Sequence, residues 1–335
     1  MAAKSRTRTS IPAIALVGPG TFLGRRTLAW LSEQATGPLI VIDAKRPESL
    51  PPEARFYKVD LTQPTADSML VDIFRTEGVD TVLHLGQYTR PQRAEAKSHE
   101  YEVIGTFHLL NAVAAAGVRK LVAASSTLVY GADPLNPNYL SESSPFRVRK
   151  SYKFVADKVE AEQLFAQFRQ RHKDKILTVL RFAPTLGPTV HNYVSASLDL
   201  PVVVTLLGFD PLIQLLHESD ALRAVQAALS RDYNGPVNIV PQDVVPLSTI
   251  LFRAGRVNLP VAHPLAYPMV ATAWSAGLSP VPSEHLDYIR YLYCADGELA
   301  QTVLDFTAEY RTGDTLASYA SVRRLRRFAT DGGGA

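Results

Sequence analysis

Glycines are concentrated in one short turn whose backbone could hold a phosphate group. The turn at 18–24 reads GPGTFLG and lies between an apolar run at 11–17 and a helical pattern. Glycine lets an anion approach the backbone closely, and the positive end of a helix dipole attracts it. Asp43 ends the next apolar run, where a carboxylate accepts hydrogen bonds from a ribose 2′-hydroxyl and repels a 2′-phosphate. The pattern predicts a dinucleotide site that prefers NAD to NADP, although Lys45 and Arg46 weaken the preference. The residues expected there are Gly18, Gly20, Thr21, Phe22, Leu23, Gly24 and Asp43.

This turn belongs to a series of alternating strand and helix patterns in the first half of the chain. Short apolar runs predict strands, and apolar residues three or four positions apart predict helices. Strands separated by helices form right-handed βαβ units with a parallel sheet. We therefore expect an α/β fold with a Rossmann-type doubly wound parallel sheet. Its strands are expected at 11–17, 39–42, 56–59, 79–85, 121–124 and 176–181, and its helices at 22–34, 66–76, 95–116 and 151–172.

The second half is rich in proline and less regular, which predicts a small C-terminal substrate lobe. We expect a cofactor domain at 11–182 with segments of 183–250 returning to its sheet, a lobe at 183–320, and flexible tails at 1–10 and 329–335. The uncharged stretch 260–278 contains three prolines, which favour a buried helix of the lobe over a membrane-spanning one. Residues 316–328 predict an amphipathic helix with four arginines, packed on the body; a membrane surface or a partner is the less favoured alternative.

Charge and cysteine content restrict the possible partners. The formal net charge is +3, but seven basic residues and one acid lie near the two ends of the chain. The remainder has 28 basic and 31 acidic residues, which makes a poor surface for nucleic acid. The single cysteine, Cys294, excludes a disulfide framework, and we find no signal peptide, so we expect a cytoplasmic protein. The eight histidines lack the spacing of a metal site, and we predict no metal.

Further motifs follow the glycine turn in order along the chain. Residues 82–86 read VLHLG, 105–112 read GTFHLLNA, 125–131 read SSTLVYG, and Lys158 and Glu162 have the spacing KxxxE; Arg181, Gly187, His217 and Asp220 complete the set. Together these motifs resemble those of the extended short-chain dehydrogenases/reductases, in the NAD-dependent epimerase/dehydratase family, over residues 11–240. The resemblance implies a Rossmann-type domain, a small substrate lobe and a homodimer joined through helices.

The resemblance also assigns roles to residues. The cofactor contacts that it implies are Asp60, Leu61, Leu85, Gly86, Ala124 and Lys158. In the family, a serine after the fifth strand binds the substrate oxygen. A lysine holds the nicotinamide ribose and lowers the pKa of a tyrosine four positions earlier, which passes a proton. Ser126 and Lys158 match the serine and the lysine.

The catalytic tyrosine has no match, because position 154 is phenylalanine. No tyrosine of this chain is followed by a lysine four residues later. Three substitutes are open: Tyr152, which reaches in only if its helix begins late; Tyr130, near the mouth by the resemblance; and a water held by Ser126. General acid–base catalysis increases the reaction rate by ~10²–10⁴-fold, so we expect Phe154 to slow the usual chemistry greatly.

The substrate side departs from the family as well. Pro184 replaces an asparagine that contacts nucleotide-sugars, and Ile213 replaces an arginine that binds their diphosphate. Glu102 replaces an asparagine that often precedes the GTxxLLxA segment. Apolar residues offer no charge-assisted donors to a diphosphate. The sequence therefore argues against a UDP-sugar substrate more strongly than against NAD.

Three functions follow from these observations. The favoured one is an NAD(H)-binding, epimerase/dehydratase-like protein whose standard proton and hydride chemistry is impaired by Phe154. The second is an active NAD-dependent epimerase or dehydrogenase acting on a sugar-like or other hydroxyl or carbonyl substrate, with Ser126, Lys158 and a substitute donor such as Tyr152. The third is an interaction or membrane-surface protein on a Rossmann scaffold. In the first two, the partner is a small molecule that the sequence does not identify.

Overall fold

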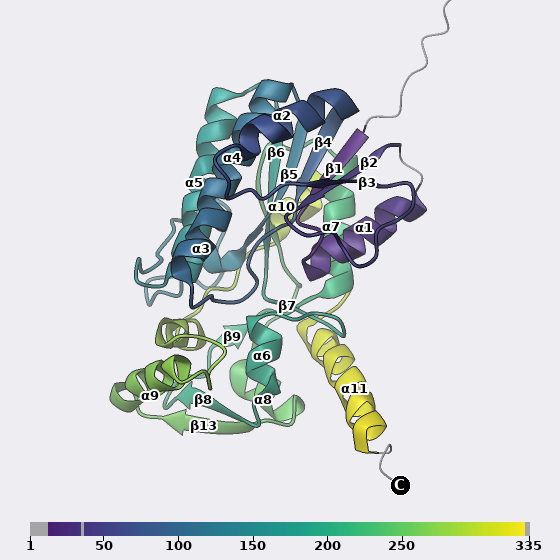
Figure 1. The fold of residues 1–335 in the computed structure, drawn as a ribbon. Helices are drawn as coiled ribbons and strands as arrows, with labels where there is room; N and C mark the ends of the chain where they lie inside the picture. Colours follow the sequence, from purple (N-terminus) through teal and green to yellow (C-terminus); the bar gives the residue numbers. More distant parts are fainter. Residues whose placement is uncertain (1–12, 35–36, 332–335) are drawn as a thin grey trace, which may run out of the picture.

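A seven-stranded sheet forms the centre of the computed structural model, which describes residues 13–34 and 37–331, with side chains to residue 323 (Figure 1). Its order is β11-β6-β5-β4-β1-β2-β3, and every neighbouring pair is parallel. The strands are β1 (Ala13–Val17), β2 (Leu39–Asp43), β3 (Arg55–Lys58), β4 (Val79–His84), β5 (Lys120–Ser126), β6 (Ile176–Phe182) and β11 (Gly235–Ile239). The predicted α/β class with a parallel sheet is confirmed.

Helices cover both faces of this sheet, which explains why its inner strands are apolar along nearly their whole length. The helices α1 (Phe22–Glu33) and α7 (Glu218–Ser230) bury one apolar cluster. The helices α2 (Ala66–Glu77), α4 (Gly105–Ala116) and α5 (Lys153–Arg171) bury another. The strand order reverses between β1 and β4, so a crevice for a ligand is expected at their carboxyl ends.

One predicted helix is interrupted. The pattern at 95–116 divides into α3 (Glu95–His99), a π-helical segment (Glu100–Ile104) and α4. A π segment shifts the faces of the helix that follows it. Phe107 is 46% exposed, although it shares the predicted spacing with Val103 and Leu110, which are buried. The other strands and helices predicted in the first half differ from the observed ones by at most two residues at their described ends.

The lobe is built from segments between β6 and the C-terminus, below the sheet in Figure 1. Its elements include β8 (Val202–Leu206) paired with β13 (Val257–Val261), α6 (Tyr193–Asp199), α8 (Leu247–Arg253), α9 (His263–Ser275) and a 3₁₀ segment (Ser283–Ile289). Short pairs join β7 (Thr185–Leu186) to β10 (Leu216–His217) and β9 (Leu212–Ile213) to β12 (Val245–Pro246). The chain continues through α10 (Glu298–Leu304) to α11 (Thr312–Asp331). One segment of 183–250, β11, pairs with β6 of the central sheet.

The uncharged stretch 260–278 lies at the surface of the lobe. Only Ala266 and Val270 of α9 are buried, while Leu265 is 65% exposed, so the expectation of a buried helix is wrong. Within the described residues, every helix is too short or too polar to cross a membrane. The helix α11 continues to Asp331, past the tail expected from 329, whereas the expected tail at 1–10 lies outside the described residues.

Candidate functional site

The glycine turn after β1 packs directly on the turn after β4. Gly18 has φ +81°, and a Cβ there would lie 2.2 Å from the Cα of Gly86. A Cβ on Gly24 would lie 2.3 Å from the carbonyl oxygen of Gly18. Side chains at these positions would force the two turns apart. The glycines are therefore required by the close approach of β1, α1 and β4.

Thr21 fixes the start of α1. Its Oγ1 accepts a hydrogen bond from the amide of Gly24 at 3.0 Å and donates one to the carbonyl of Leu85 at 3.1 Å. The φ of Thr21 is −73°, so this position needs no glycine. The first turn of α1 carries no acidic residue, which leaves the positive end of the helix at Phe22 and Leu23 open to an anion.

Asp43 ends β2 beside this turn. Its Oδ2 would lie 3.5 Å from a Cβ placed on Gly20, and its Oδ1 accepts a hydrogen bond from the amide of Lys45 at 3.3 Å. Two further predicted residues lie after β3. Asp60 accepts hydrogen bonds from the amide and hydroxyl of Thr62, and Leu61 is buried against Gly105.

Ser126, Phe154 and Lys158 line one cleft together with Thr21, Phe22, Leu23 and Leu85. Ser126 caps a 3₁₀ segment (Thr127–Tyr130) by accepting a hydrogen bond from the amide of Leu128 at 3.2 Å. The other predicted cofactor residues lie outside this lining: Gly18, Gly20, Gly24, Asp43, Asp60, Leu61, Gly86 and Ala124. Of these, Gly86 packs on Gly18, and Ala124 is partly buried within β5.

Lys158 has a charged partner that sequence reasoning missed. Its Nζ donates to Oε1 of Glu102 at 3.0 Å and to Oε1 of Gln87 at 3.1 Å. Glu102 also accepts a hydrogen bond from the amide of Tyr88 at 2.5 Å. Lys158 and Glu102 are 4% and 7% exposed, so the pair is almost fully removed from water. The acidic residue at position 102 was the available signal in the sequence. Its contact with Lys158, however, depends on how the π-helical segment Glu100–Ile104 packs on α5.

Phe154 occupies the position one helical turn before Lys158. The Lys158 Nζ lies 5.0 Å from the centre of its ring, so the two side chains share one face of α5. Phe154 has no hydroxyl, so the ammonium lies over an aromatic ring that offers it no phenol oxygen. The ring also contacts Tyr193 edge-on, at 6.2 Å between centres. Tyr193 lines the cleft and is a second residue that the sequence did not indicate.

The two tyrosines considered as substitutes point elsewhere. The helix α5 begins at Lys153, so Tyr152 precedes it, but the Tyr152 hydroxyl bonds Nδ1 of His285 at 2.9 Å and does not line the cleft. Tyr130 is fully buried, donates to Asn238 at 2.6 Å and accepts from Arg181 at 2.9 Å. The expectation that Tyr130 lies near the mouth is therefore wrong.

Some motif residues hold the fold together rather than line the cleft. Arg181 makes two hydrogen bonds to Glu162, of 2.8 and 2.7 Å, and Ser125 donates a third to the same carboxylate. His84 is buried at the end of β4. Burial, with Lys158 as the smaller cause, lowers its pKa to about 4, so it is neutral at pH 7.

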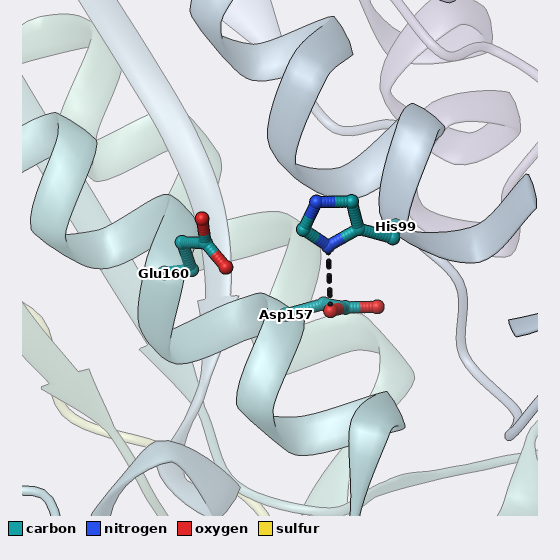
Figure 2. Close-up of side chains that lie close together, drawn as sticks. All are labelled: His99, Asp157 and Glu160. Carbon is teal, nitrogen blue, oxygen red and sulfur yellow. Dashed lines mark hydrogen bonds and ion pairs between the residues drawn. The ribbon is translucent and has the colours of Figure 1, made fainter. Parts of the chain in front are cut away.

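A histidine and two carboxylates lie together between α3 and α5. The Nδ1 of His99 is 3.0 Å from Oδ1 of Asp157, and Glu160 lies beside them (Figure 2). The three ligand atoms fall within 4.8 Å of one another, the one such group among the described residues. None of the three lines the cleft. The prediction of no metal was based on spacing along the chain, which does not reveal this contact between helices.

Comparisons with known proteins agree with this arrangement. The sequence model of the NAD dependent epimerase/dehydratase family matches residues 14–240. An uncharacterized protein of Mycobacterium tuberculosis is 28% identical over 323 residues, covering 94% of this chain and 85% of that protein.

Two solved structures share the fold. UDP-glucose 4-epimerase of Thermotoga maritima with UDP-glucose has a TM-score of 0.71 and 18% identity, covering 94% of this chain and 99% of that one. The dTDP-glucose 4,6-dehydratase of Streptomyces venezuelae with NAD has a TM-score of 0.72 and 19% identity, covering 94% and 98%. This chain belongs to the NAD-dependent epimerase/dehydratase family.

Proposed function

We propose that this chain binds NAD(H), in preference to NADP(H), in the cleft between the glycine turn and Lys158. The observation that carries the proposal is the contact between Gly18 and Gly86, where no Cβ fits, at the open N-terminus of α1. The carboxylate of Asp43 beside Gly20 supports the preference, because it repels a 2′-phosphate. The dehydratase of similar fold was solved with NAD.

Bound NAD would exchange a hydride with a substrate carbon, and the chain's own residues would position that substrate. Ser126 offers a hydroxyl to the substrate oxygen, and Lys158 offers an ammonium to a ribose. Phe154 supplies no proton, and Glu102 holds the Lys158 ammonium at 3.0 Å. We therefore propose that tyrosine-dependent epimerase or dehydratase chemistry is impaired in this protein, and that its ligand is a small molecule.

A calorimetric titration of the cofactor-free protein with NAD⁺ and with NADP⁺ tests the proposed cofactor. We expect micromolar binding of NAD⁺ and at least about tenfold weaker binding of NADP⁺. Asp43→Ala should reduce this difference. Glu48→Ala, which removes an exposed carboxylate from the same loop, should leave it unchanged. Absence of binding by either dinucleotide, or equal binding of both by the wild-type protein, would contradict the proposal.

A further inference from the structure

A second cavity lies in the lobe between α6, α8, α9 and β8, and it is partly open to solvent at exposed lining residues such as Val202 and Leu278. Its volume is about 340 Å³. Pockets for small molecules occupy roughly 300–1,000 Å³, so this cavity has the size of a ligand site.

The lining of this cavity is almost entirely apolar. None of the described side chains around it belongs to lysine, arginine, aspartate or glutamate. The polar side chains there are serines, tyrosines and His285. Burial lowers the pKa of His285 to about 4, and its Nδ1 is bonded to the Tyr152 hydroxyl, so it is neutral at pH 7 and already engaged. An anion placed here would lose its hydration and meet no cation.

Two of the lining residues replace polar residues that bind nucleotide-sugars in the family that the sequence resembles. Pro184 and Ile213 both face this cavity, together with Leu198, Val204 and Leu251. Neither a pyrrolidine ring nor a branched aliphatic side chain can donate a hydrogen bond to a phosphate. The replacements are therefore part of one continuous apolar wall.

The cavity adjoins the cleft that holds Lys158. Pro184 and Tyr193 line both spaces, and Ser126 and Lys158 line the cleft side. The Tyr193 ring, which lines both spaces, packs edge-on against Phe154 of the cleft. A molecule seated in the cavity can therefore present its end toward the hydroxyl of Ser126 and the ammonium of Lys158.

We propose that the lobe cavity binds the apolar body of a small alcohol or carbonyl compound, whose oxygen faces Ser126 and Lys158. The ligand carries no nucleoside diphosphate. The position of its oxygen rests on the function proposed above, while the apolar character of its body rests on the cavity alone. Each buried methylene adds about fourfold to affinity. Affinity therefore rises with chain length until the cavity is full.

Displacement of the neutral fluorophore 1-aminoanthracene from the full-length protein measures this binding. Primary alcohols of increasing length, from butanol to decanol, should displace the probe with affinity rising about fourfold per methylene. UDP and UDP-glucose should not displace it. A probe displaced by UDP, or alcohols of equal affinity at every length, would overturn the proposal.

Variants locate the bound probe. Ala273→Trp and Ser197→Phe each fill part of the cavity from a different helix and should weaken decanol binding at least tenfold. Phe252→Ser removes an apolar side chain that is 83% exposed and lies outside the cavity, and should leave binding unchanged. If Phe252→Ser weakened binding and the two filling variants did not, the probe would be bound at the lobe surface and the proposal would be overturned. The alcohol series on the wild-type protein decides the question if both filling variants fail to fold.

The cofactor titration separates this inference from the proposed function. Chain-length-dependent alcohol binding without NAD⁺ binding supports the apolar site and contradicts the proposed cofactor. NAD⁺ binding without alcohol binding supports the proposed cofactor and contradicts the apolar site.

Discussion

The ammonium of Lys158 is held by a carboxylate on one side and by an aromatic ring on the other. Its charge is balanced almost entirely by Glu102, because the pair is buried and Gln87 is neutral. A buried ion pair is weak evidence for net stability, but loss of one partner leaves an uncompensated charge. The stability of α5 therefore depends on a negatively charged residue at position 102.

Glu102→Gln removes this compensating charge while keeping the size of the side chain. We expect the free energy of unfolding to fall by about 3 kcal/mol at pH 7, measured by urea denaturation. Glu100→Gln, at an exposed position of the same π segment, should change it by less than about 0.5 kcal/mol. Equal effects of the two substitutions would show that the pair contributes nothing specific.

Phe154→Tyr places a phenol on the face of α5 that carries Lys158. If the cleft is otherwise competent, NADH formation with a bound alcohol should increase by about 10²-fold or more, since a positioned acid or base contributes ~10²–10⁴-fold. Phe182→Tyr adds a hydroxyl to another wall of the same cleft and serves as the control. An inactive Phe154→Tyr variant that still binds NAD⁺ and alcohol would show that Glu102 or another residue also blocks the chemistry.

At the scale of elements, the turn between β1 and α1 depends on two separate properties of Gly18. Its φ of +81° disfavours any side chain, and the Cα of Gly86 fills the space that a Cβ would need. Gly208 has a similar φ of +87° with nothing within 4 Å of its Cβ position. Substitutions at Gly208 therefore measure backbone strain alone, whereas substitutions at Gly18 measure backbone strain together with steric overlap.

Gly208→Ala should cost about 1–2 kcal/mol of unfolding free energy, the usual penalty of a left-handed backbone. Gly18→Ala should cost about 1–3 kcal/mol more, because the turns must also separate, and should abolish NAD⁺ binding. Urea denaturation and calorimetry measure the two effects. If both variants lost the same unfolding free energy, the turn containing Gly86 would be able to move away from Gly18 at no cost.

The regular elements could be predicted because their signals are local. Apolar runs gave the inner strands of the sheet, and the glycine turn indicated the start of α1. The π segment at Glu100–Ile104 could not be predicted from periodicity, since its extra residue is specified by packing against α5. For the same reason Tyr130 was misplaced: its burial depends on Asn238 and Arg181, which are distant in sequence. The pairing of Lys158 with Glu102 and the lobe cavity are also tertiary properties.

At the scale of the whole molecule, two buried histidines in different parts of the fold respond to acid in the same direction. His84 lies at the end of β4 and His285 in the lobe, and burial lowers the pKa of each to about 4. In the unfolded chain a histidine has a pKa of about 6.5. Between these values the unfolded state binds more protons than the folded state, so acid favours unfolding.

We therefore expect the stability of the protein to be complete above about pH 6.5 and to fall as the pH approaches 4. The shift of each histidine corresponds to roughly 3 kcal/mol, a large part of the 5–15 kcal/mol typical of a folded domain. Urea denaturation from pH 7 to pH 4 measures the slope. His84→Gln and His285→Gln should each reduce it by about 1.4 kcal/mol per pH unit, whereas His191→Gln, at an exposed position, should not. If all three variants keep the wild-type slope, the acid response originates in carboxylates, and neither histidine is held neutral by the fold.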